Sequence, residues 1–326
     1  MLLRATYLRH VYSGFEAARA CDVIYGSSFE HRLLSARLAT LEHQRLVLGD
    51  VRLDTGNYDL PIAALGRMPK DAICIGFVLE GCGVARYNTK AIGPDEIQIY
   101  PAGSELLYQV TGPSRWITIS LAEERLQAMA VARRSKTLTL RRDAPYTIRL
   151  CPGGRAKLGY QVLDAMDIAR RLQSDGEMTL QLAHEIRESL LANCVDTLFN
   201  AAPPQKSDRN SIEQRYHSIV SACERLVFSG SIVDFDLADV ARRSGYTLRS
   251  LEIIFRRSVG MTPGQWFMAA RLNGTLRDLL SSNHGNSIAG IATKWGFRHL
   301  PRFACYYHKA FGERPSDTLR RARSKQ

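Results

Sequence analysis

One stretch of the C-terminal third of the chain occurs twice. Residues 237–263 (LADVARRSGYTLRSLEIIFRRSVGMTP) align with residues 288–315 (IAGIATKWGFRHLPRFACYYHKAFGERP). The apolar and glycine positions of the first copy recur 51 residues later, and after one inserted residue they recur 52 residues later. A repeat of this kind restricts the fold to one that holds two copies of the same local structure.

Each copy predicts two short helices joined by a tight turn. Asp236 and Ser287 stand where an N-cap is expected, and apolar residues follow at i, i+3 and i+4. Gly245 and Gly296 then end the first helices, because the residue after a helix commonly takes a positive φ. A helix, a glycine turn and a second helix form helix-turn-helix geometry. The residues expected to be buried in the second helices are Leu251, Ile254, Phe255, Phe303, Tyr306 and Tyr307.

A single rigid helix is predicted between the two copies. Thr262 supplies an N-cap and Pro263 occupies the first helical position. The pattern continues for about seventeen residues, roughly 25 Å of helix, and ends near residues 283–285. If both copies face one side of a DNA duplex about one turn apart, ~34 Å, both second helices can enter successive major grooves.

Length and charge are consistent with two domains that differ in character. A chain of 326 residues is about twice the usual domain size. Residues 205–326 hold 20 of the 44 basic residues but 10 of the 32 acidic ones, so most of the net charge of +12 lies there. Such an excess suits nucleic acid, an anionic membrane or a solvated basic surface. Seven cysteines without a CxxC pair and the lack of a long apolar run favour a cytoplasmic protein without a membrane span.

The N-terminal two thirds predict an antiparallel β-structure followed by two helices. Short apolar runs between residues 44 and 121 alternate with turn residues about every ten positions, as in a small barrel or sandwich. Residues 159–173 and 178–200 have helical periodicity. Their apolar stripe must be covered either by the barrel or by a second copy of the chain. The segment 201–211 contains Pro203 and Pro204 and is the predicted linker.

Residues 212–321 resemble the DNA-binding domain of the AraC/XylS family of bacterial transcription regulators. The second copy carries the matching positions, Ser287-Ile288, Ile291-Ala292, Gly296-Phe297, Phe303 and the run FGERPS at 311–316. The string GFRHLPRF also resembles a branch that includes ethanolamine-utilisation regulators. Residues 79–103, with Gly-Pro-Asp and Pro-x-Gly turns, resemble the family's cupin-like sensor barrel.

The resemblance implies an α+β chain of two domains. We expect a cupin-like β-barrel with appended helices that binds an effector and dimerises over residues 1–200, a linker over 201–211, and an all-α domain with two helix-turn-helix units over 212–326. The implied partners are double-stranded promoter DNA, RNA polymerase, a small-molecule effector and a second copy of the chain. We expect an effector-responsive activator in the cytoplasm, with no membrane partner.

The side chains that the buried stripe leaves exposed are the candidate DNA contacts. In the first copy, arginine can bond guanine, glutamate can accept from cytosine and isoleucine can touch a thymine methyl. In the second copy, the family usually has polar or basic groups where Cys305 and His308 stand, so phosphate contacts from its arginines are expected there. Cys305 itself is expected to fill space rather than to act as a redox switch. The candidates are Arg249, Glu252, Ile253, Arg256, Arg298, His299, Leu300, Pro301, Arg302, Ala304, Cys305 and His308.

No enzyme, metal or cofactor motif is expected to be functional. Metal-binding cupins need histidines in the barrel strands, and none of the eight histidines lies between residues 44 and 121. A cupin enzyme fused to a DNA-binding domain, and a dimerising regulator without an effector, remain the alternatives. Polar and aromatic residues of the predicted strands that can orient a small ligand are Glu80, Arg86, Tyr87, Tyr100, Tyr108 and Trp116.

Overall fold

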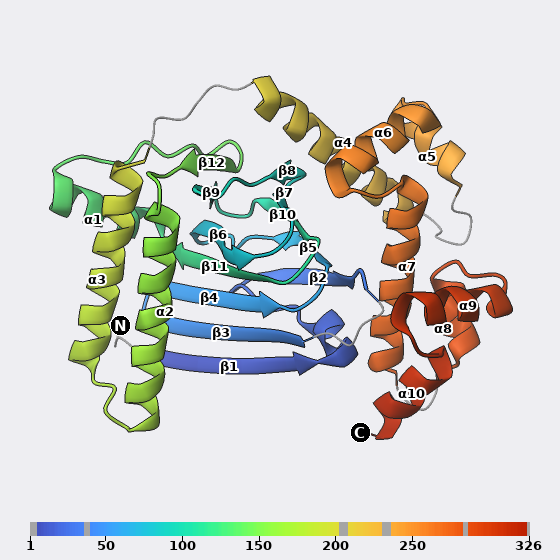
Figure 1. Cartoon of the computed structure of the whole chain (residues 1–326), viewed down its shortest axis with the longest axis horizontal. Coiled ribbons are helices and arrows are strands. Elements are labelled where there is room, and N and C mark those ends of the chain that lie inside the picture. The colour runs from blue at the N-terminus through green and yellow to red at the C-terminus, as the bar shows by residue number, and fades with distance from the viewer. Residues whose placement is uncertain (1–4, 36–39, 202–207, 230–235, 283–285, 325–326) are drawn as a thin grey trace.

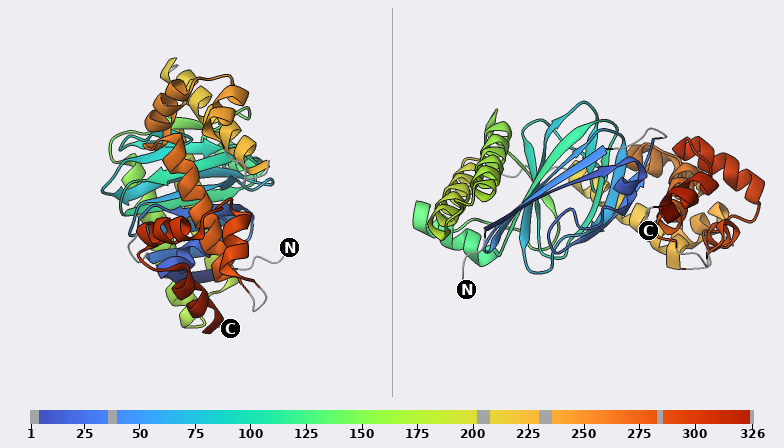
Figure 2. Two further views of the ribbon diagram at one scale, coloured as in Figure 1. Left: turned by 90° about the vertical axis from the view of Figure 1, so that its right-hand side faces the viewer. Right: turned by 90° about the horizontal axis from the view of Figure 1, so that it is seen from below.

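The computed structural model describes residues 5–35, 40–201, 208–229, 236–282 and 286–324. It consists of a part built on two β-sheets, with helices on its outer side, and a helical part at the opposite side (Figure 1). Seen from below, helices, two sheets and the second group of helices follow one another as layers (Figure 2).

Two antiparallel sheets form the N-terminal part. The larger sheet contains, in spatial order, β1 (Ala5–Ser13), β3 (Thr40–Leu48), β4 (Val51–Tyr58), β11 (Ser114–Leu121), β6 (Ile73–Gly81), β9 (Glu96–Tyr100) and β12 (Tyr146–Arg149). The smaller sheet contains β2 (Ser28–Leu33), β5 (Ile62–Arg67), β10 (Glu105–Val110), β7 (Ala85–Tyr87) and β8 (Lys90–Ala91). A 3₁₀ helix, η1 (Gly14–Arg19), follows β1. The pairings between described residues leave both sheets open, which confirms a β-sheet domain and leaves the cupin-like barrel a prediction.

The larger sheet is buried on both faces. Along β6, Ile75 and Phe77 pack into the core beneath the helices, while Cys74 and Val78 face the smaller sheet. This alternation explains why β6 reads as one continuous apolar run rather than as alternating apolar and polar residues. The space between the sheets is therefore an apolar interior.

Three helices cover the outer face of the larger sheet. They are α1 (Glu123–Arg134), α2 (Gly154–Ser174) and α3 (Leu180–Phe199), and the last two run side by side (Figure 1). Their apolar residues, including Val162, Leu191 and Val195, join the core under the sheet. The predicted helix pair is present, and the sheet covers its stripe, so the stripe does not itself require a second copy of the chain.

In the C-terminal part, the described residues form the helices α4 (Asp208–Ser229), α5 (Leu237–Ser244), α6 (Leu248–Val259), α7 (Pro263–Leu280), α8 (Ile288–Lys294), α9 (Leu300–Phe311) and α10 (Pro315–Ser324). The rod predicted between the repeats is α7, and its Thr262 and Gln265 form a reciprocal capping box. Residues 283–285, where its end was predicted, lie outside the described residues. So do residues 202–207 of the predicted linker, and α4 begins within the linker's last four residues.

One local prediction about a side chain is wrong. The apolar run RLVLGDVRL, residues 45–53, spans a turn, where Gly49 has a φ of 67° between β3 and β4. Tyr306 is not buried: 45% of its surface is exposed, since the stripe of α9 passes through Phe303 and Tyr307 instead.

The two parts of the chain are docked through a buried arginine. Arg32 of β2 is 1% exposed, and its guanidinium lies 2.5 Å from Glu224 of α4 and 2.7 Å from Glu30. The same group lies over the ring of Trp266, 5.1 Å from its centroid. Next to it, the side-chain amide of Asn273 accepts from the backbone N–H of Leu33 at 2.8 Å and donates to its carbonyl at 3.1 Å. The edge of β2 is thus hydrogen-bonded by a side chain of α7.

Replacing Gly274 by alanine is expected to destabilise the helical part. A Cβ at this position of α7 would lie 2.3 Å from the indole of Trp295. Overpacking costs about 1–3 kcal/mol, which outweighs the gain of about 1 kcal/mol for alanine over glycine in a helix. We expect a net loss of up to about 2 kcal/mol in urea unfolding.

The matched control for this change is Gly264→Ala in the same helix. Nothing lies within 4 Å of a Cβ at Gly264, so this variant should be neutral or slightly more stable. Equal stability of the two variants would contradict the close approach of α7 to Trp295.

Candidate nucleic-acid interface

The first helix pair is defined by its caps. Asp236 accepts from the N–H of Ala238 at the start of α5, and Gly245 ends that helix with a φ of 74°. Thr247 then accepts from the N–H of Ser250 at 3.1 Å and starts α6. Only two residues separate the cap glycine from α6, so the angle between the helices is set by local hydrogen bonds.

The exposed face of α6 carries the predicted contacts. Leu251, Ile254 and Phe255 are buried, as predicted. The structure places Arg249, Glu252, Ile253 and Arg256 together on the opposite, exposed face. Within the described residues, neither Arg249 nor Arg256 makes an ion pair, whereas Arg242 of α5 pairs with Asp239.

The second pair repeats the first with a longer turn. Ser287 accepts from the N–H of Gly290 at 3.0 Å, and Gly296 has a φ of 77°. His299 stands at the N-cap of α9 but its side chain makes no capping bond, unlike Thr247. Of the predicted contacts in this copy, Ala304 is half-buried and the others are exposed, namely Arg298, His299, Leu300, Pro301, Arg302, Cys305 and His308.

Arg271 fixes the turn of the second pair to α7. Its guanidinium donates to the carbonyls of Trp295, at 2.7 Å, and of Gly296, and it lies 4.3 Å from the ring centroid of Phe297. Burial lowers the pKa of this arginine. Sequence reasoning missed Arg271, because nothing in the repeat identifies a side chain that bonds a turn 24 and 25 positions further along the chain.

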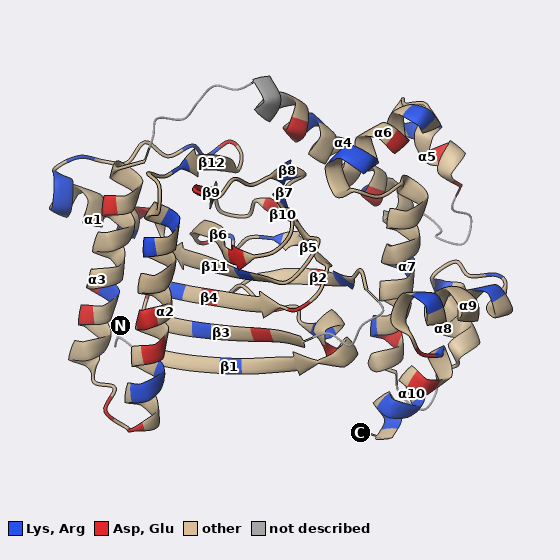
Figure 3. Cartoon of the chain, viewed as in Figure 1, with Lys and Arg blue, Asp and Glu red and all other residues tan. Residues whose placement is uncertain are grey.

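The first pair is attached to the same rod. Phe255 of α6 lies 5.6 Å from Phe267 of α7, centroid to centroid, and both rings are fully buried. Lys and Arg residues occur on both outer helix pairs (Figure 3). Two exposed, arginine-bearing helices held by one rod form a surface suited to the phosphates and base edges of a nucleic acid.

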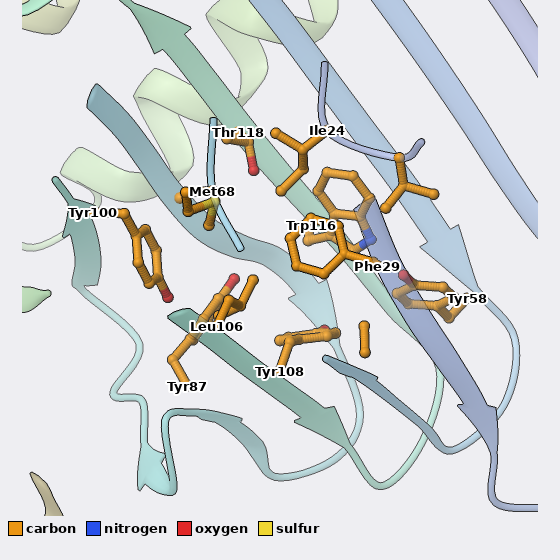
Figure 4. A pocket seen from close by; sticks show the side chains of 13 residues that line it. Ile24, Phe29, Tyr58, Met68, Tyr87, Tyr100, Leu106, Tyr108, Trp116 and Thr118 are labelled. Carbon is orange, nitrogen blue, oxygen red and sulfur yellow. The ribbon is translucent and has the colours of Figure 1, made fainter. Parts of the chain in front are cut away.

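A second candidate site lies between the two sheets. Its volume is about 30 Å³, and its wall includes Tyr58, Tyr87, Tyr100, Tyr108 and Trp116 (Figure 4). Burial raises the pKa of each of these four tyrosines, so all are neutral hydroxyls at pH 7. We call this space the inner cavity.

Four of the six predicted effector contacts line the inner cavity, namely Tyr87, Tyr100, Tyr108 and Trp116. The structure does not bring the other two there. Glu80 is exposed beside Arg115, 3.9 Å away, and Arg86 is half-exposed on β7. Gly56 of β4 makes room for the indole of Trp116, since a Cβ there would lie 2.5 Å from the ring.

Two histidines outside the predicted barrel segment fold next to the inner cavity. His31 bonds the hydroxyl of Tyr58 at 2.8 Å, and His43 stacks near Trp116 and bonds Asp54 at 3.0 Å. Within the described residues, no group of three or more metal-ligating side chains is present, and no helix is long and apolar enough to cross a membrane. These histidines were missed because they precede residue 44, where the β-pattern was first recognised.

Comparison with known proteins identifies the helical part. A family model described as a helix-turn-helix domain matches residues 240–321. The probable thc operon regulatory protein of Rhodococcus erythropolis is 39% identical over 85 residues, which are 26% of this chain and 26% of that protein. The activator AarP of Providencia stuartii is 31% identical over 121 residues, 36% of this chain and 85% of that protein.

CuxR is among the solved structures that match most of the chain. This AraC-like transcriptional activator is 15% identical, with 88% of this chain and 100% of its own chain covered and a TM-score of 0.38. The match of the family model to the helical part places the protein among those with a helix-turn-helix domain. The chain belongs to the AraC/XylS family of transcription regulators. It matches only about a quarter of the length of the R. erythropolis relative.

Proposed function

We propose that the protein is a sequence-specific DNA-binding regulator that activates bacterial promoters in response to an effector. The observation that carries this proposal is that α6 and α9, at equivalent positions of the two repeats, expose their polar faces while both are packed on α7. A rigid pair of exposed helices is the arrangement that two successive major grooves require.

In this proposal each helix pair is a helix-turn-helix unit. Arg249 bonds a guanine through O6 and N7, Glu252 accepts from a cytosine and Ile253 touches a thymine methyl. Arg298, His299 and Arg302 of the second unit hold phosphates and set the register of the protein on the duplex. The first unit therefore reads more sequence than the second.

The sheet part takes the regulatory role. We propose a cupin-like effector and dimerisation domain over residues 1–200, a linker over 201–211 and a DNA-binding domain over 212–326. The inner cavity, with its aromatic wall, supports a small-molecule effector as a ligand. RNA polymerase and a second copy of the chain are the proposed partners, in the cytoplasm.

Selection of genomic fragments by the purified chain tests this function. We expect a small set of enriched fragments with a shared motif, whose binding exceeds that of random DNA at physiological salt by 10³-fold or more, roughly the span of specific over non-specific affinities. Salt-sensitive binding without any preferred fragment would contradict the proposal.

Replacing Arg249 by alanine is expected to weaken operator binding by about 1–3 kcal/mol and to relax the preference at one base pair. The reason is the loss of a bidentate contact to guanine. Gel shifts on the operator and on single-base variants measure both effects.

Arg302→Ala is the comparison variant for Arg249→Ala. Because Arg302 is proposed to contact a phosphate, its replacement should weaken binding to all DNA sequences alike. It should also reduce the slope of log affinity against log salt concentration by about 1. If Arg249→Ala also weakens every sequence variant equally, Arg249 does not read a base.

A further inference from the structure

A second cavity lies at the junction of the two parts of the chain. It has a volume of about 330 Å³ and is lined by residues of the segments 87–105 and 141–147 and by α4, which contributes His217 and Ser218. We call it the junction cavity. Tyr87 and Tyr100 line both cavities, so the two spaces meet at these rings, whose centroids are 5.9 Å apart.

Gln98 presents an unused amide to the junction cavity. Its side chain is almost fully buried, and neither its Nε2 nor its Oε1 has a hydrogen-bond partner among the residues that the structure describes. A buried amide without partners is costly, and buried polar groups in folded proteins are nearly always bonded. The missing partner is therefore expected to be a ligand or bound water.

Tyr100 presents a second side chain on the same face of β9 as Gln98. Gln98 and Tyr100 are two positions apart on β9 and so point to one face, about 7 Å from each other along the strand. The intervening Ile99 faces the opposite core. The hydroxyl of Tyr100 also lacks a partner. One strand face thus offers a polar anchor at Gln98 and an aromatic wall beside it.

The charges around the junction cavity are balanced. Two cations, Lys90 and Arg141, and two carboxylates, Glu105 and Glu213, line it. Arg141 is paired with Asp143 at 2.7 Å. Burial lowers the pKa of His217, which keeps its imidazole neutral at pH 7. No excess of either sign is available to hold a charged ligand against the cost of burying it.

We propose that the junction cavity binds an uncharged ligand with a carboxamide-type group bonded to Gln98 and an apolar ring against Tyr87 and Tyr100. An amide offers one donor and one acceptor side by side, which match the two atoms of Gln98 whichever way that side chain is turned. A carboxylate offers acceptors alone and leaves Oε1 of Gln98 unpaired.

This inference deepens the proposed function, on whose effector-responsive role it rests. Because α4 belongs to the helical part and β9 to the sheet part, a ligand in the junction cavity touches both. Its binding is then linked to the docking of the two parts, in proportion to its difference in affinity for the docked and undocked states.

Benzamide and benzoate, two probes of nearly the same shape, test the proposal by calorimetric titration of the full chain. We expect benzamide to bind at least tenfold more tightly than benzoate. Gln98→Met should lose at least tenfold in benzamide affinity while its melting temperature stays equal or rises, because an unpartnered buried amide has been removed. Gln181→Met, at an exposed position of α3, should leave benzamide binding unchanged.

Equal or tighter binding of benzoate, or unchanged benzamide affinity in Gln98→Met, would overturn the proposal. The comparison of the two probes on the unmodified chain needs no variant, so it holds even if Gln98→Met does not fold. If neither probe binds while the chain still selects operator fragments, the ligand class fails and the DNA-binding function stands. If benzamide binds as expected but the chain selects no operator fragments, the ligand class stands and the DNA-binding function fails.

Discussion

Replacing Arg32 by alanine is expected to lower the free energy of unfolding by about 3–5 kcal/mol, the usual cost of removing one partner from a buried ion pair. Arg32 is held by Glu224 of α4 and Glu30 of its own strand, and its guanidinium lies 5.1 Å from the ring centroid of Trp266 and 5.8 Å from that of Phe228. Without it, Glu224 loses its cationic partner in a partly desolvated junction, while Glu30 keeps Arg277 at 3.3 Å. Among the described residues, Glu224 then keeps its bond from the indole N–H of Trp266 alone.

Urea unfolding followed by tryptophan fluorescence and circular dichroism measures this loss. Because Arg32 joins the two parts of the chain, the variant should also separate one transition into two, as the parts unfold independently. The control is Arg67→Ala. Arg67 pairs with Glu105 at 2.8 Å, but its side chain is 67% exposed, so its loss should cost about 1 kcal/mol or less. Similar losses in both variants would show that Arg32 does not hold the junction.

The helical part could be predicted from the sequence because its signals are local. The cap residues Asp236, Thr262 and Ser287 act on N–H groups two or three positions away, and all three caps are present. The offsets of the repeat reproduce the helix boundaries, since Leu248–Val259 and Leu300–Phe311 differ by 52 positions at both ends. Tyr306 was wrongly expected to be buried, because the apolar face of α9 was assumed to be wide enough to include it. The face of α9 that is buried in the structure is narrower.

The docking of the two parts could not be predicted in this way. The bond from Arg32 to Glu224 joins residues 192 positions apart, and no local pattern marks either side chain as buried. The strand SFEHRL alternates poorly and holds three ionisable groups, so it reads as solvent-exposed. It is instead a strand edge covered by α7, where a buried charge is tolerated because it is paired on two sides.

The candidate effector contacts show the limit of strand periodicity. Alternation correctly implies that about half of the polar and aromatic strand residues face inward. Alternation alone does not show which of these residues face inward, because that depends on the register with the neighbouring strands. Tyr87, Tyr100, Tyr108 and Trp116 face the interior, whereas Glu80 lies past a bulge in the pairing of β6 with β11 and reaches the surface. The junction cavity could not be predicted from the sequence, because its walls come from both parts of the chain.

Acidification is expected to destabilise the protein through His31. Burial lowers the pKa of His31 from 6.5 to about 4, and the nearby guanidinium of Arg277 acts in the same direction. Between these two values the unfolded chain binds a proton that the folded chain does not, so the free energy of unfolding falls as the pH falls. At 1.36 kcal/mol per pKa unit, this single group costs about 3 kcal/mol from pH 6.5 to pH 4. Above pH 6.5 its contribution is constant.

The comparison of His31→Gln with the unmodified chain isolates this effect. Glu30 and His43 also act on His31, but they are common to both proteins, so the difference between the two pH profiles belongs to position 31. Urea unfolding at several values between pH 7 and pH 4.5 should give a steep decline for the unmodified chain and a shallower one for the variant. His184→Gln, whose imidazole is 50% exposed on α3, should follow the unmodified chain. Parallel profiles for His31→Gln and the unmodified chain would mean that His31 takes up its proton in the folded state, and that the bond to Tyr58 beside the inner cavity does not depend on a neutral imidazole.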